Sequence, residues 1–146
     1  MNVTPVIGLV QPSQLKAWVE DTRSALQEHP STAEWCTRQM FLVGSKAVNG
    51  FGNDTDVVLV HMDLDDAAQC LDIAGWVTCQ AEVYRGVESD GWFSARKGDI
   101  NLLVSIPEVA DLWLTANRVC CVFRDIVQRD TTRDERVRLH RAVFND

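Results

Sequence analysis

The chain has 146 residues, of which 46% are hydrophobic, and its 21 acidic against 14 basic residues give a net charge of −7. This composition is typical of a soluble globular protein, and residues 1–146 have the length of a single domain. No apolar stretch approaches the roughly 20 residues of a membrane helix, and the amino terminus lacks a signal-peptide pattern, so we expect a cytoplasmic protein without a membrane partner. The acidic excess repels a phosphate backbone and disfavours polymeric DNA as a partner.

The cysteines and histidines show no pattern typical of a metal site or a disulfide framework. The five cysteines are odd in number and contain no C-x-x-C pair, which favours buried, reduced thiols. The three histidines are far apart and share no ligand spacing, so structural or solvated roles are expected for them.

The first predicted element is an amphipathic helix. From Ser13 to Leu26, apolar residues recur with helical spacing, and the helix is expected to end before Pro30. Ser31 and Glu34 have the spacing of a capping box, which predicts a short helical turn before the first strand.

Two strands and two helical segments follow in the middle of the chain. The apolar run at 39–43 predicts a strand, and a short helical segment after it is expected to break at Gly50. The β-branched run at 55–61 is typical of a strand buried on both faces. Asp63 is expected to cap a helix that closes at Gly75.

The second half predicts two or three strands between residues 75 and 105, with a turn-rich connection at 86–91. Ser105 and Glu108 indicate a capping box at the start of a long amphipathic helix. Thr132 and Glu135 repeat this pattern before a final helix. The expected fold class is therefore α/β, with a small mixed β-sheet flanked by helices.

The composition of two further stretches also predicts where they lie in the fold. The basic run 124–141 is interleaved with acidic residues, which predicts a solvated helical face. Tryptophans are expected in the core. For Trp92 and Phe93, close in sequence to Arg96, contact with a base or an acceptor stays open as a second interpretation.

Three acidic residues are candidates for metal ligands. A strand alternates its side chains, so Asp54 and Asp56 are expected on one face, about 7 Å apart. Asp99 heads the later apolar strand and is the candidate third acid. Carboxylates in this arrangement can hold one or two divalent cations that activate an attacking oxygen and stabilise a leaving one.

Small and basic residues near these strands are candidates for phosphate contacts. Gly44 and Ser45 lie between a strand and a helix start, where backbone N–H groups and a hydroxyl can approach a phosphate. Lys46, Arg96 and Lys97 could neutralise a triphosphate. The strand register leaves open which of the last two faces the site.

In this order, these residues resemble the nucleotidyltransferase superfamily that includes DNA polymerase β. The stretch FLVGSKAVNGFGNDTDVVLV matches an apolar strand, a Gly-Ser pair and an Asp-x-Asp on the next strand, and ARKGDINLLVS matches the strand with the third acid. The strand KGDINLLVS with the helix after it, and the end RDTTRDERVRLHRAVF, are also similar to small nucleotidyltransferase-like proteins of tailed bacteriophages. That likeness would place the protein in the host cytoplasm.

The resemblance implies a nucleotidyltransferase-like fold and transfer of a nucleoside monophosphate from a nucleoside triphosphate such as ATP. Its acceptor would be a hydroxyl on a protein, a tRNA or a small molecule. It further implies Mg²⁺ or Mn²⁺ on Asp54, Asp56 and Asp99, with Asp99 nearest the acceptor, and β- and γ-phosphates on Gly44 and Ser45.

Two alternatives stay open. Only eight residues separate Ser45 from Asp54, and Thr55 replaces the usual apolar residue between the acids. The short spacing and the lack of an acceptor domain favour a non-catalytic protein of this fold that binds and modulates a host or partner protein. A third interpretation is an acidic decoy for a DNA-binding protein.

Overall fold

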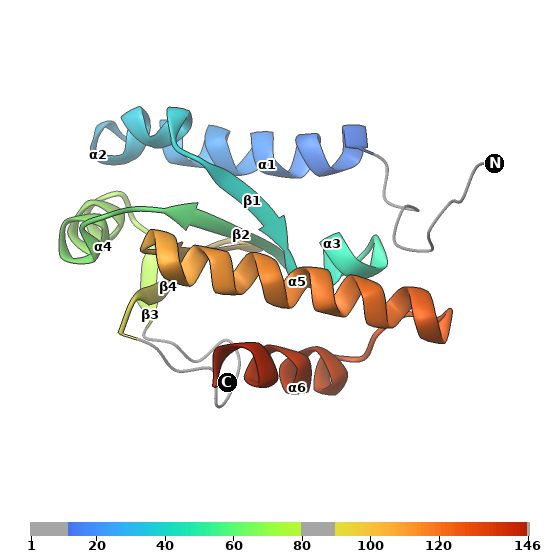
Figure 1. The fold of residues 1–146 in the computed structure, drawn as a ribbon. Helices are drawn as coiled ribbons and strands as arrows, with labels where there is room; N and C mark the ends of the chain where they lie inside the picture. The colour runs from blue at the N-terminus through green and yellow to red at the C-terminus, as the bar shows by residue number, and fades with distance from the viewer. Residues whose placement is uncertain (1–11, 80–89, 146) are drawn as a thin grey trace.

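The computed structural model describes residues 12–79 and 90–145. This part contains six α-helices, one short 3-10 helix and five strands (Figure 1). The elements in chain order are α1 (Pro12–Gln27), α2 (Pro30–Ala33), η2 (Glu34–Thr37), β1 (Met40–Val43), α3 (Gly44–Asn49), β2 (Thr55–Val60), α4 (Leu64–Ile73), β3 (Val77–Cys79), β4 (Trp92–Lys97), β5 (Ile100–Ser105), α5 (Pro107–Val127) and α6 (Arg133–Phe144).

The five strands form one mixed sheet in the order β1-β2-β5-β4-β3. β2 and β5 are parallel, whereas the other three neighbouring pairs are antiparallel. The predicted α/β class with a mixed sheet flanked by helices is therefore confirmed. The expected connection at 86–91 lies largely outside the described residues.

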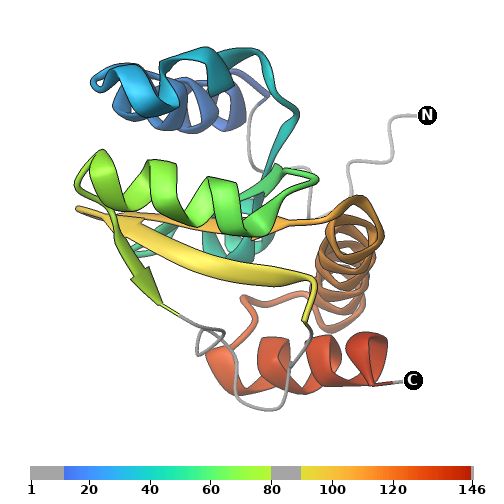
Figure 2. The same ribbon diagram turned by 90° about the vertical axis from the view of Figure 1, so that its left-hand side faces the viewer.

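Helices cover both faces of the sheet (Figure 2). On one face, α1, η2 and α4 enclose a core that includes Trp35, Leu71 and the strand residues Val57 and Leu59. On the other face, α5 packs on the sheet, and Trp113 contacts Trp92 with ring centroids 4.9 Å apart. Because cores lie on both faces of β2, its residues Val57–Val60 form a continuous apolar run rather than an alternating pattern.

The second interpretation of Trp92 and Phe93 is not supported by their positions. Trp92 is 4% exposed and Phe93 is 9% exposed, and they belong to the cores on opposite faces of the sheet. Alternation along β4 places them there, so their rings are core residues.

Two of the three predicted capping boxes are wrong, and both errors involve a proline. Pro30 and Pro107 occupy the first helical positions, so His29 and Ile106 become the N-cap residues of α2 and α5. Proline at this position has its φ preset for a helix and fixes the start there. Ser31 instead donates from Oγ to the carbonyl of Cys70, and Ser105 to that of Leu103.

The third capping box is confirmed. Thr132 Oγ1 accepts from the Glu135 backbone N–H at 3.1 Å, and the Glu135 carboxylate accepts from the Thr132 N–H at 2.9 Å. Asp63 likewise caps α4 by accepting from the Asp66 N–H at 3.0 Å. No proline competes at either position, so the side-chain pattern alone determines where the helix begins.

The basic run 124–141 is not uniformly solvated, which corrects the sequence interpretation. Arg124 is 6% exposed and Arg136 is 9% exposed. Arg124 pairs with Asp130 at 3.1 Å, and Arg136 donates to the Thr131 carbonyl at 2.8 Å. Both arginines therefore fasten the loop between α5 and α6 to the protein interior.

The described cysteine side chains are free thiols: Cys120 is buried, whereas Cys70 and Cys121 are partly exposed. Burial raises the pKa of Cys120 to about 12, so this thiol stays protonated. None of the helices in residues 12–79 and 90–145 combines the length and apolar character needed to cross a bilayer.

Candidate active site

The predicted site residues gather at one edge of the sheet. β1 and β4 end there, whereas β2 and β5 begin there, because the first two run antiparallel to their neighbours. In the register, Asp56 pairs with Asn101 on β5, and Asn101 pairs with Arg96 on β4. Directly paired residues point to the same face of a sheet, so these three side chains form a row on the face covered by α5.

Gly44 lies directly against Asp56. Its φ of +79° falls in the left-handed region, which glycine adopts without strain. A Cβ at this position would overlap Oδ2 of Asp56. The turn from β1 into α3 therefore requires glycine for two reasons: backbone conformation and close approach to a carboxylate.

Asn117 of α5 holds this turn from the other side. Its Oδ1 accepts a hydrogen bond from the Gly44 N–H at 3.2 Å. The amide that was predicted to contact a phosphate is thus already engaged by a side chain. Ser45, the next residue, faces the following loop, because a Cβ on Gly52 would overlap the Ser45 Oγ.

Asp56 is a partly buried carboxylate whose negative charge is only partly stabilised by its neighbours. Asn101 Nδ2 donates to its Oδ1 at 3.1 Å. Burial raises the pKa of Asp56 above its ordinary value and the negative charge of Asp54 raises it further, whereas the hydrogen bond from Asn101 lowers it. A positive charge between Asp54 and Asp56 would relieve this excess of negative charge.

Asp54 makes a two-pronged ion pair with Arg96. The Arg96 nitrogens Nη1 and Nη2 donate to Oδ1 and Oδ2 of Asp54 at 3.2 and 3.0 Å. The side chains are 42% and 46% exposed, so the pair is worth at most about 1 kcal/mol. A ligand that binds Asp54 more strongly can displace Arg96 at little cost.

Asp99 is exposed at the head of β5, and its carbonyl accepts from the Thr55 N–H at 2.7 Å. Within residues 12–79 and 90–145, no group of three or more His, Cys, Asp or Glu side chains is placed to hold a metal ion. The position paired with Asp56 on β5 is Asn101 rather than an acid. The expected three-acid ligand set is therefore not assembled in this structure.

A two-carboxylate site nevertheless fits one hard divalent cation. Mg²⁺ is commonly held by one or two carboxylates together with water and substrate phosphate oxygens. The negative charge of Asp54 raises the pKa of Asp56, and Asp56 Oδ2 accepts no hydrogen bond from the described residues. These two residues are the ones that could hold the ion.

The register places Arg96, and not Lys97, on the face of the acids. Lys97 lies on the opposite face, where it pairs with Glu28 at 2.9 Å and stands 6.0 Å from the Trp76 ring. Lys46 also points to that face, donating to Thr55 Oγ1 at 2.6 Å beside Trp18. The two lysines are therefore engaged on the face of the sheet opposite to Asp56.

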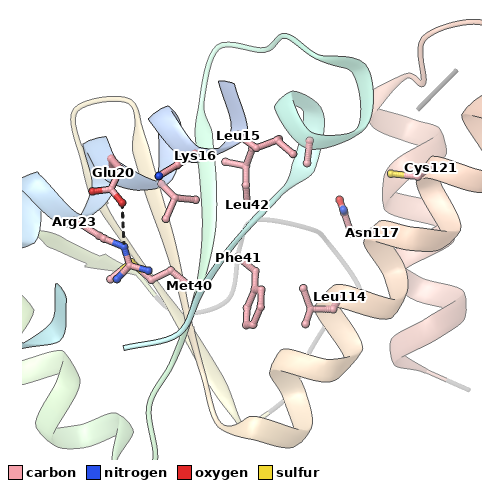
Figure 3. A pocket seen from close by; sticks show the side chains of 12 residues that line it. Leu15, Lys16, Glu20, Arg23, Met40, Phe41, Leu42, Leu114, Asn117 and Cys121 are labelled. Carbon is pink, nitrogen blue, oxygen red and sulfur yellow. Dashed lines mark ion pairs between the residues drawn. The ribbon is translucent and has the colours of Figure 1, made fainter. Parts of the chain in front are cut away.

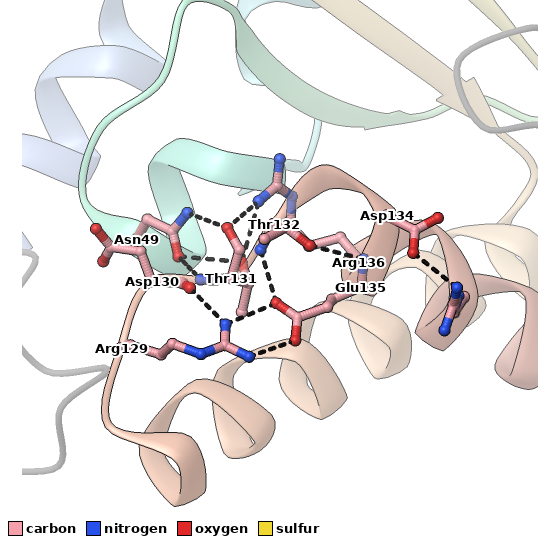
Figure 4. A network of polar contacts seen from close by, with 9 residues as sticks. Asn49, Arg129, Asp130, Thr131, Thr132, Asp134, Glu135 and Arg136 are labelled. Carbon is pink, nitrogen blue, oxygen red and sulfur yellow. Dashed lines mark hydrogen bonds and ion pairs between the residues drawn. The ribbon is translucent and has the colours of Figure 1, made fainter.

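The asparagines that support the site were not among the residues predicted from the sequence. Asn101 is the one polar residue within the run INLLV, two positions after Asp99, and this interruption was the available signal. Asn49, at the end of α3, makes three hydrogen bonds of 2.9 to 3.1 Å with Thr131. Arg136 also donates to Thr131, so the network in Figure 4 ties α3 to α6.

Comparison of the sequence with protein-family models gives no match, and neither does comparison with curated proteins. The resemblance to nucleotidyltransferases therefore stays a proposal that depends on the residue pattern and the site geometry.

Proposed function

We propose that this protein is a minimal magnesium-dependent nucleotidyltransferase with a nucleotidyltransferase-like fold. It would transfer a nucleoside monophosphate from a nucleoside triphosphate to a hydroxyl group on a protein, a tRNA or a small molecule. The observation that carries the proposal is the contact of Gly44 with Asp56, which brings the turn after β1 against the Asp-x-Asp at the head of β2.

The acids have distinct roles in this proposal. Asp54 and Asp56 would hold the divalent ion, which when bound supplies positive charge to the phosphates and lowers the cost of charge development. Asp99 is exposed beside the same strand heads and would accept the proton of the acceptor hydroxyl. The acceptor oxygen bonds to the α-phosphorus as the bond from that phosphorus to the bridging oxygen breaks, and pyrophosphate leaves.

Arg96 is the basic residue best placed to contact the phosphates. It lies on the face of the acids and already binds Asp54 through both terminal nitrogens. A guanidinium released from Asp54 can bind a phosphate through two parallel hydrogen bonds. Lys46 and Lys97, on the other face, are better explained as structural residues.

The ion pair of Arg96 with Asp54 also favours a second candidate function. In this structure both oxygens of the Asp54 carboxylate bind Arg96, and the three acids do not form a ligand group in the described residues. A non-catalytic protein that binds and modulates a host or partner protein would have this fold without needing an assembled metal site.

Label transfer separates the two candidates. We would incubate the protein with each α-labelled ribonucleoside triphosphate and Mg²⁺ or Mn²⁺, alone and in cell lysate. The proposed enzyme transfers label in the wild type and in Asp65→Asn, an exposed acid on α4 at the other face, but not in Asp54→Asn, Asp56→Asn or Asp99→Asn. Unchanged transfer in all three would rule out the proposed roles, and no transfer with any protein would favour the non-catalytic function.

A further inference from the structure

A groove runs along the outer edge of β1, on the side away from β2 (Figure 3). β1 is the first strand of the sheet, so this edge pairs with no other strand in the described part of the chain. The groove has a volume of about 540 Å³ and lies between α1 and α5. Its lining is mainly apolar, with Leu15 and Val19 from α1, Phe41 and Leu42 from β1, and Leu114 from α5.

The register shows which backbone groups of β1 face the groove. The Val60 N–H donates to the Gln39 carbonyl, and these two residues are opposite each other in the antiparallel register. Hydrogen-bonded and non-hydrogen-bonded pairs alternate along such a ladder. Phe41 and Val43 therefore bond to β2, whereas Met40 and Leu42 direct their N–H and C=O groups into the groove.

Flanking helices satisfy the outward groups at both ends of this stretch. The Arg38 carbonyl accepts from Arg23 Nη1 of α1 at 3.2 Å, and the Gly44 N–H donates to Asn117 of α5 at 3.2 Å. Between these two contacts, the outward groups of Met40 and Leu42 have no hydrogen-bond partner within residues 12–79 and 90–145. The open section is short, framed at both ends and lined by apolar side chains.

We propose that this groove binds an extended segment of another polypeptide, which adds to β1 as a sixth strand. An unpaired strand edge is a template for such pairing, with hydrogen bonds to the backbone and contacts for alternate side chains. Apolar side chains of the segment would pack on Leu15 and Val19 on one side and on Phe41 and Leu114 on the other.

Charge specifies the occupant further. The groove rim carries Lys16 and Arg23 against a single acid, Glu20, in a chain whose net charge is −7. Arg23 pairs with Glu20 at 3.8 Å, whereas Lys16 forms no ion pair with the described residues. The segment that fits is apolar at alternate positions and has an acidic residue near Lys16. This inference does not depend on the proposed catalytic function.

Amide hydrogen exchange followed by NMR tests the open edge in the free protein. The amides of Met40 and Leu42 should exchange at least about tenfold faster than those of Phe41 and Val43, which are bonded to β2. Equal protection of all four amides in a monomer would mean that the chain covers its own edge, and protection together with a dimer in sedimentation would mean that a second copy does. Either result overturns the proposal.

A defined peptide pool tests the occupant. We would add acetylated, amidated hexapeptides with Val or Thr at alternate positions and one Asp at varied positions. Peptide binding should slow hydrogen exchange at the amides of Met40 and Leu42. Methylating alternate amide nitrogens of the peptide should abolish this protection. If no peptide in the pool protects these amides, the proposal is wrong.

Variants of the protein complete the test. Leu42→Pro removes one outward N–H, at an edge position where proline is tolerated, and should weaken peptide binding by about tenfold or more, whereas Leu42→Val should retain it. Lys16→Glu should weaken the Asp-containing peptides, with Arg138→Glu on the exposed face of α6 as the matched charge control. Equal binding by Lys16→Glu and Arg138→Glu would refute the assignment of the acidic residue.

Discussion

Replacing Gly44 with alanine tests the contact on which the site depends. The backbone there has a φ of +79°, which costs an alanine about 1–2 kcal/mol. The added Cβ would also overlap Oδ2 of Asp56, and forcing extra atoms into a packed position costs about 1–3 kcal/mol more. Gly44→Ala should therefore lower the free energy of unfolding by about 2–5 kcal/mol, the sum of these two costs.

Gly75→Ala is the matched control. Gly75 has a similar φ of +89°, and a Cβ there meets no atom within 4 Å. This variant should lose only the backbone cost of about 1–2 kcal/mol. The difference between the two variants then isolates the overlap with Asp56.

Urea unfolding followed by fluorescence of the five tryptophans measures both losses. In an Asp56→Ala background, the cost of Gly44→Ala should fall towards that of Gly75→Ala, because the overlapping carboxylate is gone and only the Cβ of residue 56, at 3.2 Å, remains. Equal losses for the two single variants, or a cost of Gly44→Ala that is independent of Asp56, would refute the close approach.

Three further measurements examine the charges. The pKa of Asp56 is raised in the folded state, so the contribution of this carboxyl to stability becomes unfavourable as pH rises above about 3.8. In urea unfolding, Asp56→Asn should therefore stabilise the protein more at pH 7 than at pH 3.5. An equal effect at both pH values would contradict the burial of this carboxyl. Arg129 and the cap of α6 lower the pKa of Glu135 to about 2. The stability that Glu135 contributes is therefore present above about pH 4.5 and is lost as pH falls towards 2. Glu135→Gln should reduce this loss of stability at low pH, and an unchanged dependence of stability on pH would contradict this role of Glu135. Arg96→Gln removes a competitor for Asp54 and should tighten Mn²⁺ binding about two- to five-fold in calorimetry, whereas weaker binding would mean that Arg96 does not compete.

The sheet and most helix positions could be predicted because their signals are local and strong. The stretch Val57–Val60 has no polar interruption, and β2 has a neighbouring strand on both sides. The helix starts at Pro30 and Pro107 were misjudged because a proline and a nearby serine compete to define the N-cap, and the backbone restriction of proline prevails.

The candidate site was predicted less completely, because it depends on register between distant strands. That Asp54 and Asp56 share a face follows from alternation along one strand. The pairing of Asp56 with Asn101, and the choice of Arg96 over Lys97, depend on how β2, β5 and β4 align, which alternation within each strand does not determine.

In the enzyme that we propose, Asp54 and Asp56 hold a divalent ion together with a nucleoside triphosphate. The most direct measurement is Mn²⁺ binding by electron paramagnetic resonance, with and without a non-hydrolysable triphosphate analogue. The analogue should tighten Mn²⁺ binding in the wild type and in Asp65→Asn, and this effect should disappear in Asp54→Asn and Asp56→Asn. Mn²⁺ binding that is unaffected by both substitutions, or by the analogue, would contradict this proposal.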